Sequence, residues 1–246
     1  MKKIIIEDIS LEFRLYHDGA SSIKEYFANI FRKKKRKHYT DFYALQNVSF
    51  SVNDGERVGI IGRNGAGKST LLRTVSRIYE PTLGSITVNG RVAPLLDIGA
   101  GFHPEFSGRE NIYFNGALLG YTKEQLRSIE DEVIAFAELQ DFIDSPVKYY
   151  STGMYMKLAF SLATTVQPDI LILDELFVGG DANFVRRGKD RMNKMIDNSS
   201  VMLLVSHDAE LLRSLCQRFI WLDHGKVIAD GDVAVLDEYI GIGTQP

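Results

Sequence analysis

Cysteine is almost missing from the chain, which has one thiol, Cys216, among 246 residues. One cysteine excludes an internal disulfide framework and suits a reducing cytoplasm, and a lone cysteine most often packs as a small apolar residue. Long apolar runs are missing too, since none approaches the ~18 residues of a membrane-spanning helix. The start, Met1–Lys3 followed by Ile4–Ile6, has too short an apolar region for a signal peptide. The sequence therefore predicts no segment that crosses a membrane.

The chain also lacks the excess of positive charge that a general nucleic-acid binder usually carries. It has 29 Lys and Arg residues against 32 Asp and Glu residues, a formal net charge of −3. It has no internal repeat and no low-complexity tract apart from one basic run. With 45% apolar residues over 246 positions, it is long enough for a large buried core. We therefore expect a single domain over 1–246 with one insertion.

The most specific motif is the loop Gly62–Ser69, which fits the pattern G-x-x-x-x-G-K-[ST]. An apolar strand at 57–61 precedes it and a helical pattern at 69–75 follows it. In that context the glycines allow a tight turn whose N–H groups surround phosphate oxygens, and the helix adds the positive end of its dipole. Lys68 would reach the β- and γ-phosphates, and the Ser69 hydroxyl would bind Mg²⁺. The alternative, an incidental glycine turn, does not account for the strand and the helix on either side.

Two uninterrupted apolar strands end in residues with functional chemistry. The first, 169–174, closes on Asp174 and is followed by Glu175, and the second, 201–205, is followed by His207. Such strands, alternating with helices, predict a parallel sheet covered on both faces that binds ligands at the carboxyl ends of its strands. There Asp174 would hold Mg²⁺, Glu175 would orient or deprotonate the water that attacks the γ-phosphate, and His207 would donate to that phosphate. The alternatives are an acid pair that only solvates the strand end and a histidine with a structural role.

The segment 150–154 opens a helix, and its Ser151 and Gly153 offer backbone donors to an anion. In isolation this pattern indicates only a helix N-cap. Beside a complete phosphate loop, a second anion site suggests a further nucleotide contact across a subunit interface.

A segment without core character lies between the first two strands. Ser22–Glu25 has the form of a capping box, and apolar residues at helical spacing follow it up to the six cations Arg32–Lys37. An amphipathic helix that ends in a polybasic cluster can lie on an anionic membrane surface. The alternative is a solvated surface insertion whose cations favour the helix C-terminus. Six cations exceed what such a helix end needs, so the sequence favours contact of Ile23–Lys37 with the membrane surface or a membrane partner.

The remaining patterns predict strands, helices and two hairpins. Asn89-Gly90 and His224-Gly225 each indicate the turn of a hairpin. The expected strands are 3–9, 43–52 and the arms of the hairpins within 85–96 and 219–229, and the expected helices are 110–119, 123–138, 153–166 and 232–240.

Taken in order, the phosphate loop, a helical insertion, Y-S-T-G-M at 150–154, L-I-L-D-E at 171–175 and V-S-H at 205–207 resemble the ATP-binding subunit of an ABC transporter. The resemblance covers about 3–8 and 43–240, and Y-S-T-G-M stands where the family usually has L-S-G-G-Q. It implies an α/β P-loop NTPase fold with a mixed sheet core, an antiparallel β subdomain and a helical subdomain inserted at about 103–165. Residues 10–42 would form an amphipathic, basic insertion.

The resemblance also implies a head-to-tail homodimer that holds two ATP molecules, with Mg²⁺, between its subunits. Each ATP would contact the phosphate loop and strand ends of one subunit, and Ser151 and Gly153 of the other. Asp181 matches a family aspartate that couples the two sites. Tyr43 lies near the position where the family stacks an aromatic ring on adenine, and a core tyrosine at a strand start is the alternative. On this basis the predicted nucleotide-binding residues are Tyr43, Gly62, Arg63, Asn64, Gly65, Ala66, Gly67, Lys68, Ser69, Thr70, Ser151, Gly153, Asp174 and Asp181, the catalytic residues are Lys68, Glu175 and His207, and the Mg²⁺ ligands are Ser69 and Asp174.

Two longer runs, 99–112 and 150–161, resemble the branch of this family that exports O-antigen, capsule or teichoic-acid polymers. This implies an ATPase motor that exports a lipid-linked polysaccharide, with O-antigen as the favoured cargo. The motor would be peripheral on the cytoplasmic face of the bacterial inner membrane and would bind two copies of an integral membrane subunit. Where the family usually has a glutamine, this chain has Ile98 beside Asp97. It stops at Pro246, without the carbohydrate-binding domain of some O-antigen exporters. The alternatives are an ABC subunit for another cargo and a soluble ABC-type ATPase that acts on nucleic acid or ribosomes.

Overall fold

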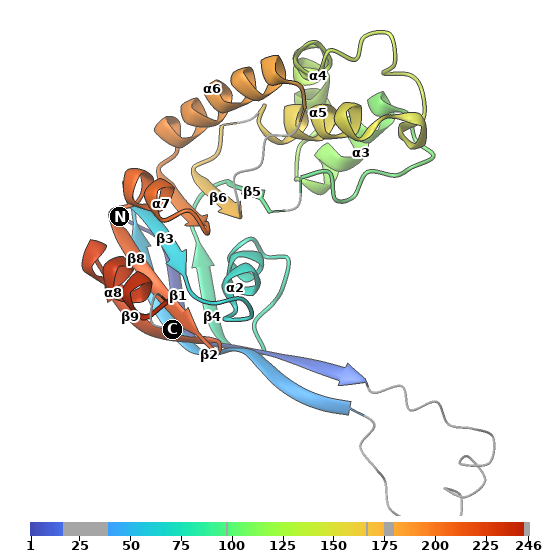
Figure 1. Ribbon diagram of the computed structural model, residues 1–246. Coiled ribbons are helices and arrows are strands. Elements are labelled where there is room, and N and C mark those ends of the chain that lie inside the picture. The colour runs from blue at the N-terminus through green and yellow to red at the C-terminus, as the bar shows by residue number, and fades with distance from the viewer. Residues whose placement is uncertain (17–38, 97, 166, 175–179, 244–246) are drawn as a thin grey trace, which may run out of the picture.

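The computed structural model describes residues 1–16, 39–96, 98–165, 167–174 and 180–243 (Figure 1). Asp97, Glu175 and the segment Ile23–Lys37 lie outside these described residues, so what the sequence predicts for them stays a prediction. Within the described ranges, no helix combines the length and the apolar character needed to cross a membrane.

A six-stranded sheet forms the centre of the fold. Neighbouring strands from β5 to β8 run parallel, and β9 is antiparallel to β8. β7 is buried throughout and β6 is buried up to Asp174, which confirms the covered parallel strands predicted from the continuous apolar runs. The antiparallel β9 makes the sheet mixed, as the resemblance implies. The strand order is β5 (Val92–Leu95), β6 (Ile170–Asp174), β7 (Val201–Val205), β3 (Arg57–Ile61), β8 (Arg218–Asp223) and β9 (Lys226–Gly231).

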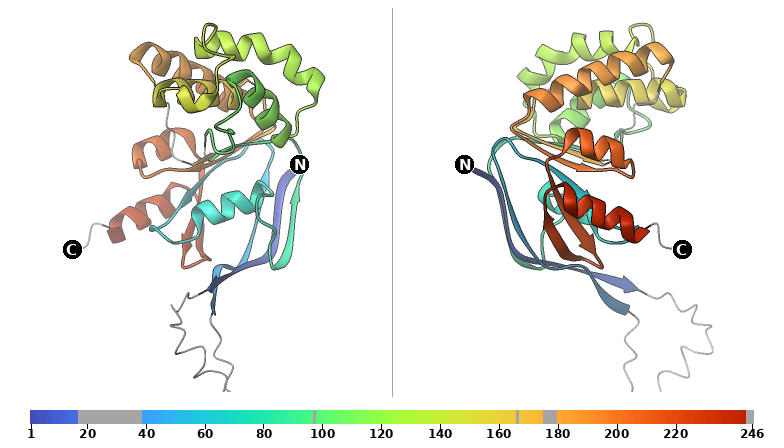
Figure 2. Two further views of the ribbon diagram at one scale, coloured as in Figure 1. Left: turned by 90° about the vertical axis from the view of Figure 1, so that its right-hand side faces the viewer. Right: turned by 60° about the vertical axis from the view of Figure 1, so that its left-hand side comes forward.

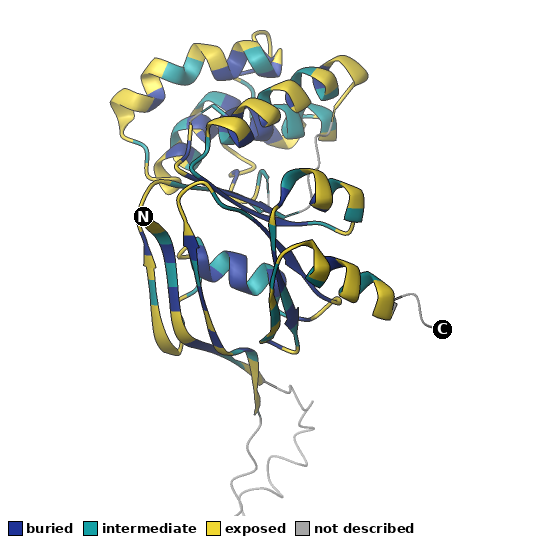
Figure 3. Ribbon diagram, turned by 90° about the vertical axis from the view of Figure 1, so that its left-hand side faces the viewer, coloured by how far each residue is buried: buried dark blue, intermediate teal, exposed yellow. Residues whose placement is uncertain are grey.

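A three-stranded antiparallel sheet lies against the first one. Its order is β2 (Tyr39–Asn53), β1 (Lys2–Tyr16) and β4 (Leu83–Val88). Helix α2 (Lys68–Val75), which leaves the phosphate loop, packs in one apolar core with strands of both sheets (Figure 2). Most of α2 is therefore buried, as the dark blue helix in Figure 3 shows. The start of this helix is fixed between two sheets.

β1 and β2 extend further than the sequence predicts. β1 continues past the predicted end at residue 9, and β2 begins before residue 43, so the two strands pair over both ends of the predicted insertion 10–42. Phe13 lies opposite Phe42, and their rings stack with centroids 5.7 Å apart. The paired ends of β1 and β2 project as an arm at the lower right of Figure 1. The aromatic cross-strand pair explains why strand structure continues here, because such pairs stabilise a ladder.

The predicted hairpin over 85–96 is wrong. β4 belongs to the antiparallel sheet, with Val88 opposite Ile4, and β5 belongs to the six-stranded sheet, where it pairs with β6. A two-residue type I′ turn needs a positive φ at both central residues, and only Gly90, at 137°, has one. The chain therefore crosses between the sheets at this point. The second predicted hairpin is confirmed, since β8 and β9 pair around His224 and Gly225 with φ of 44° and 77°.

Three of the predicted helices correspond to α3 (Gly108–Leu118), α4 (Lys123–Ala137) and α5 (Thr152–Ala163), with a 3₁₀ turn η1 (Val147–Tyr149) before α5. We refer to α3, α4, η1 and α5 as the helical unit. α3 and α4 begin with capping boxes, in which Ser107 pairs with Glu110 and Thr122 with Gln125. The helical unit has an apolar core of its own.

The remaining helices, α6 (Ala182–Asn198), α7 (Ala209–Leu215) and α8 (Val233–Gly243), cover the face of the six-stranded sheet that α2 does not cover. Cys216 lies in this second core and is 7% exposed. Burial raises the pKa of its thiol to about 12, which confirms the predicted small apolar role.

Candidate functional site

Three parallel strands of the six-stranded sheet end at one edge, and a cavity of about 790 Å³ opens there. The register pairs Asp174 of β6 with Val205 of β7, and Leu204 of β7 with Gly59 of β3. The residues that follow these strands therefore meet at one level, as predicted for the carboxyl ends of a parallel sheet. The predicted residues that line the cavity are Tyr43, Asn64, Gly65, Gly67, Lys68, Ser69, Thr70, Asp174 and His207.

The phosphate loop closes around its own lysine. Lys68 is 8% exposed, and its Nζ donates to the carbonyl oxygens of Gly62 at 2.7 Å and Arg63 at 3.0 Å. Gly62, Arg63 and Ala66 belong to the loop but are not among the residues that line the cavity. The ammonium group is thereby held against two carbonyl oxygens of its own loop, in a residue that lines the cavity, where an anion entering the loop would meet it.

Backbone contacts seat this loop against both sheets. The carbonyl oxygen of Ala66 accepts from Gly225 N at 2.9 Å, and the carbonyl oxygen of Gly225 accepts from Gln46 N at 2.8 Å. A Cβ atom on Gly67 would stand 2.7 Å from the carbonyl oxygen of Ala44. The loop, the β8–β9 turn and β2 therefore form one connected wall of the cavity.

Asp174 and His207 face this wall from the other strand ends. His207 lies in a tight turn between β7 and α7, in which Ser206 Oγ accepts from Asp208 N at 3.0 Å. Asp208 then caps α7, accepting from Glu210 N at 3.0 Å and Leu211 N at 3.1 Å. The turn fixes the backbone on both sides of His207. The prediction that this histidine lies at the same sheet edge as Asp174 is confirmed.

The other end of the cavity is aromatic. Tyr43 is 46% exposed and lines the cavity, so the alternative of a core tyrosine is wrong. Phe13 and Phe42 line it too, although the sequence assigned both to the insertion 10–42, outside the site. Phe13 also meets Tyr79 edge to face, with centroids 5.4 Å apart. The two adjacent aromatic residues at 42 and 43 could have indicated this aromatic part of the site from the sequence. Phe13 is recognisable only through its pairing across the sheet.

Ser151, Gly153 and Asp181 line a second cavity of about 500 Å³, separate from the first. Ser151 is the N-cap of α5 and accepts from Met154 N at 3.2 Å. Asp181 is the N-cap of α6 and lies beside Lys157, whose ammonium lowers the pKa of its carboxyl to about 2. The three predicted residues are thus brought together, at a distance from the phosphate loop of their own chain.

The cavity offers few metal ligands of its own. No group of three or more His, Cys, Asp and Glu side chains in the described ranges is arranged to hold a metal ion. Ser69 and Asp174 supply a hydroxyl and a carboxylate to the same cavity. Such a pair of oxygen donors fits Mg²⁺, which keeps waters and takes the remaining ligands from phosphate. Ile98 contributes nothing here, because it packs between the second core and the core of the helical unit.

Solved and curated proteins resemble this chain along most of its length. Residues 45–178 match the family described as ABC transporter. The chain is 39% identical to the O-antigen export system ATP-binding protein RfbB of Klebsiella pneumoniae, over 91% of each chain. It is 43% identical to RfbB of Myxococcus xanthus and 41% identical to the teichoic acids export ATP-binding protein TagH of Lactococcus lactis. These two matches cover 92% and 96% of this chain but only 53% and 50% of the relatives.

Two solved structures share the fold. One is a dimeric ATP-binding cassette in a post-hydrolysis state bound to ADP and Pi, with a TM-score of 0.65 and 19% identity over 94% of this chain and 98% of the other. The second is the ATP-binding subunit of an ABC transporter, with a TM-score of 0.66 and 22% identity over 98% of this chain and 95% of the other. The α/β architecture described above is therefore that of an ATP-binding cassette.

We expect Gly67→Ala to lower the free energy of unfolding more than Gly65→Ala. Both glycines have a positive φ, 103° and 81°, where a residue with a side chain costs roughly 1–2 kcal/mol. A Cβ at Gly67 would also collide with Ala44, whereas nothing lies within 4 Å of a Cβ at Gly65. Urea unfolding of the two variants measures the difference. Equal losses would mean that the loop does not rest on β2.

Proposed function

The chain belongs to the ABC transporter family, and on that premise we propose that it is the ATP-hydrolysing motor subunit of an exporter for a lipid-linked polysaccharide, with O-antigen as its cargo. The observation that carries the proposal is the cavity where the phosphate loop, Asp174 and His207 meet. The cargo rests on relatives named for O-antigen export, one of which matches over 91% of its length. Teichoic acid is the alternative cargo, favoured by the similarity to TagH, which is named for teichoic acid export.

The cavity suits ATP because its two ends differ in chemistry. Phosphates would enter the loop, where an ammonium with three N–H donors can serve loop carbonyls and phosphate oxygens alike. The adenine ring would lie at the aromatic end, against Tyr43 and the stacked pair Phe13 and Phe42.

The catalytic roles follow from the strand ends. Ser69 and Asp174 would hold Mg²⁺, which neutralises charge on the β- and γ-phosphates when bound. Glu175, directly after Asp174 in the sequence, would orient the attacking water or take its proton. His207 would donate to the γ-phosphate from the neighbouring strand, and Lys68 would stabilise the developing negative charge.

The second cavity would complete the site of another copy of the chain, in a head-to-tail homodimer. Gly153, in the first turn of α5, has no positive φ, and a Cβ there would meet only Ser151 Oγ at 3.8 Å. The fold itself therefore does not require glycine at this position. A glycine there allows a group from outside the chain to approach the backbone N–H groups at the helix start. Asp181, in the same cavity, would then link this contact to its own subunit's site.

A membrane partner would use the motion of this dimer. Apolar side chains are exposed on α3 of the helical unit and just before it, where Phe106, Phe114 and Leu118 are 36%, 41% and 67% accessible. Phe114 and Leu118 are one turn apart on α3, and Phe106 contacts Phe114 edge to face at 5.7 Å. An exposed apolar group of this kind marks an interaction surface. We assign it to an integral membrane subunit, present in two copies, that holds the chain at the cytoplasmic face of the inner membrane, and Ile23–Lys37 would add contact with the membrane surface.

The chain should co-purify from detergent extracts with an integral membrane protein and without RNA. Phe114→Glu should weaken this association because it adds a charge to the apolar surface of the helical unit. Ile228→Glu, at a 53% exposed apolar residue on β9, is the matched control and should leave the association intact. Recovery of RNA or ribosomes without a membrane protein would instead favour a soluble ATPase that acts on nucleic acid, a function that the net charge of −3 disfavours.

Lys68→Ala should reduce ATP hydrolysis by about a hundredfold or more, since removal of one donor to developing charge costs about 10²–10³ in rate. Lys189→Ala, at an exposed lysine on α6, is the matched control and should hydrolyse ATP at the wild-type rate. Release of inorganic phosphate by the purified chain measures both. Near-normal turnover in Lys68→Ala would contradict the assignment of the phosphate loop.

Mixing two inactive variants tests the shared site. Gly153→Asp should fold, because space is open there and an acid suits the first turn of a helix, yet its carboxylate would repel the phosphates of the opposing subunit. Lys68→Ala alone and Gly153→Asp alone should both be inactive. A mixed dimer contains one site that carries neither change, so mixing the two proteins should restore part of the hydrolysis. No recovery on mixing, with dimers present, would mean that each chain builds its site alone.

A further inference from the structure

Lys157 connects two elements of the second cavity through ion pairs. Its Nζ, on α5, lies 2.5 Å from Asp181 Oδ2 at the start of α6 and 3.0 Å from Glu138 Oε2 at the end of α4. The Lys157 side chain is 14% exposed, so protein covers most of it. The Asp181 and Glu138 side chains are 54% and 44% exposed, so the covered ammonium meets its two carboxylates at the edge of the cavity, where solvent reaches them.

Asp181 is held from two directions. Its Oδ1 accepts from Asn183 N at 3.1 Å and Phe184 N at 3.0 Å, bonds that cap α6. Its Oδ2 faces Lys157. The backbone bonds to one oxygen and the ion pair to the other therefore fix together the rotation of the carboxylate about its Cβ–Cγ bond.

Lys157 also lies on the same helix as the residues proposed to reach the other subunit. Gly153 and Lys157 are four residues apart on α5, so they lie one turn apart on one face. Both line the second cavity together with Ser151 and Asp181. The ion pair therefore links the start of α5 to the start of α6 within a single wall.

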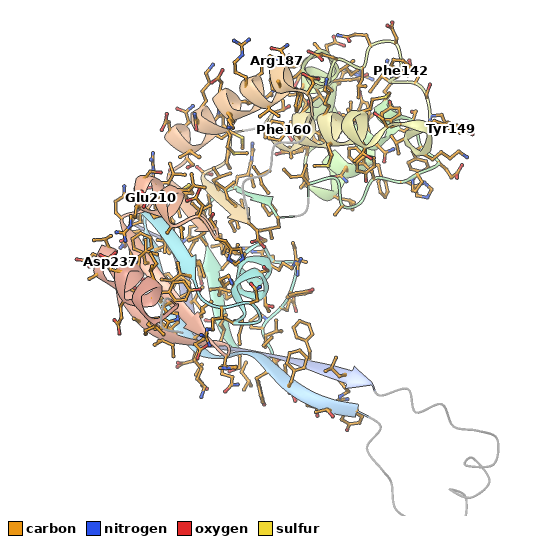
Figure 4. All side chains as sticks on the ribbon, in the orientation of Figure 1. Phe142, Tyr149, Phe160, Arg187, Glu210 and Asp237 are labelled. Atoms are coloured by element: carbon orange, nitrogen blue, oxygen red, sulfur yellow. The ribbon has the colours of Figure 1, made fainter. Side chains whose placement is uncertain are left out.

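An aromatic junction keeps the three helices in a fixed relation around this pair. Phe136, Phe160 and Phe184, from α4, α5 and α6, contact one another with ring centroids 5.4, 5.7 and 6.3 Å apart. Arg187 of α6 pairs with Glu138 and lies over the Phe136 ring at 5.1 Å. Figure 4 shows Phe160 and Arg187 in the region where α5 and α6 approach each other. The junction packs α5 and α6 against each other, and Lys157 forms a polar contact between them at the cavity.

We propose that Lys157 is a positioning residue, which sets Asp181 relative to Ser151 and Gly153 so that the three present one preformed face to the nucleotide of a second copy of this chain. The inference rests on the proposed function. It predicts that loss of Lys157 slows hydrolysis while nucleotide binding at the phosphate loop persists, because Lys157 does not line that cavity.

The test compares Lys157→Met, Lys157→Arg and the control Lys148→Met. Lys148 also lies in the helical unit and pairs with Glu105 at 2.7 Å, away from both cavities. Lys157→Met should lower kcat roughly tenfold or more with KM and Tm nearly unchanged, since a displacement of about 1 Å can cost about a hundredfold in rate. Lys157→Arg should recover much of the rate, and Lys148→Met should match wild type. If Lys157→Met unfolds, Lys157→Gln takes its place.

A double variant separates positioning from general damage. If Lys157 acts through Asp181, then Lys157→Met combined with Asp181→Asn should lose no more rate than Asp181→Asn alone. Additive losses, or a wild-type kcat in Lys157→Met, overturn the inference. A wild-type chain that neither hydrolyses ATP nor dimerises with it overturns the proposed function instead, so the two failures are distinguishable.

Discussion

The close approach of three backbone segments at the phosphate loop is the constraint on which the site depends. A Cβ on Gly67 or Gly225 would stand 2.7 Å or 2.6 Å from the carbonyl oxygen of Ala44, and one on Gly62 would stand 2.2 Å from that of Leu222. Larger residues at these positions would force the loop away from β2 and from β8. The walls of the cavity would then separate, because the loop, the aromatic end of β2 and the β8–β9 turn are held to one another by backbone. The glycines are thus needed for contact between layers as well as for the turn itself.

The sequence predicts well those parts of the fold whose burial determines the pattern of neighbouring residues. β6 and β7 read as continuous apolar strands because both of their faces are buried, and the structure confirms that burial. Once the sheet is known to be parallel, the meeting of Asp174 and His207 follows from geometry, since the carboxyl ends of the strands share an edge. The phosphate loop is recognisable for a similar reason, because the spacing of its glycines follows from the backbone conformation of the turn.

The parts that the sequence did not predict depend on partners far away along the chain. Asn89-Gly90 is a strong local turn signal, yet the strands on either side pair in two different sheets, β4 with β1 and β5 with β6. Phe13 reaches the cavity only because it pairs with Phe42 across β1 and β2. The ion pair between Lys157 and Asp181 joins two helices that also meet at the apolar contact of Phe160 with Phe184. None of these contacts can be read from a short stretch of neighbouring residues, because the partners lie far apart in the sequence.

Gly153 differs from the other glycines in a way that bears on function. Gly67 and Gly225 have positive φ and no room for a side chain, so the fold accounts for both. Gly153 has neither constraint, and it stands in the first turn of α5 with open space around it. A glycine that relieves no strain in its own chain is consistent with a requirement from outside the chain. Phe142, which lines the same cavity and is 51% exposed, agrees with this reading, because a large apolar side chain beside an open helix start suits a surface that a second molecule covers (Figure 4). In the proposed homodimer, the second cavity would form half of a site, and the phosphate loop of the other subunit would form the other half.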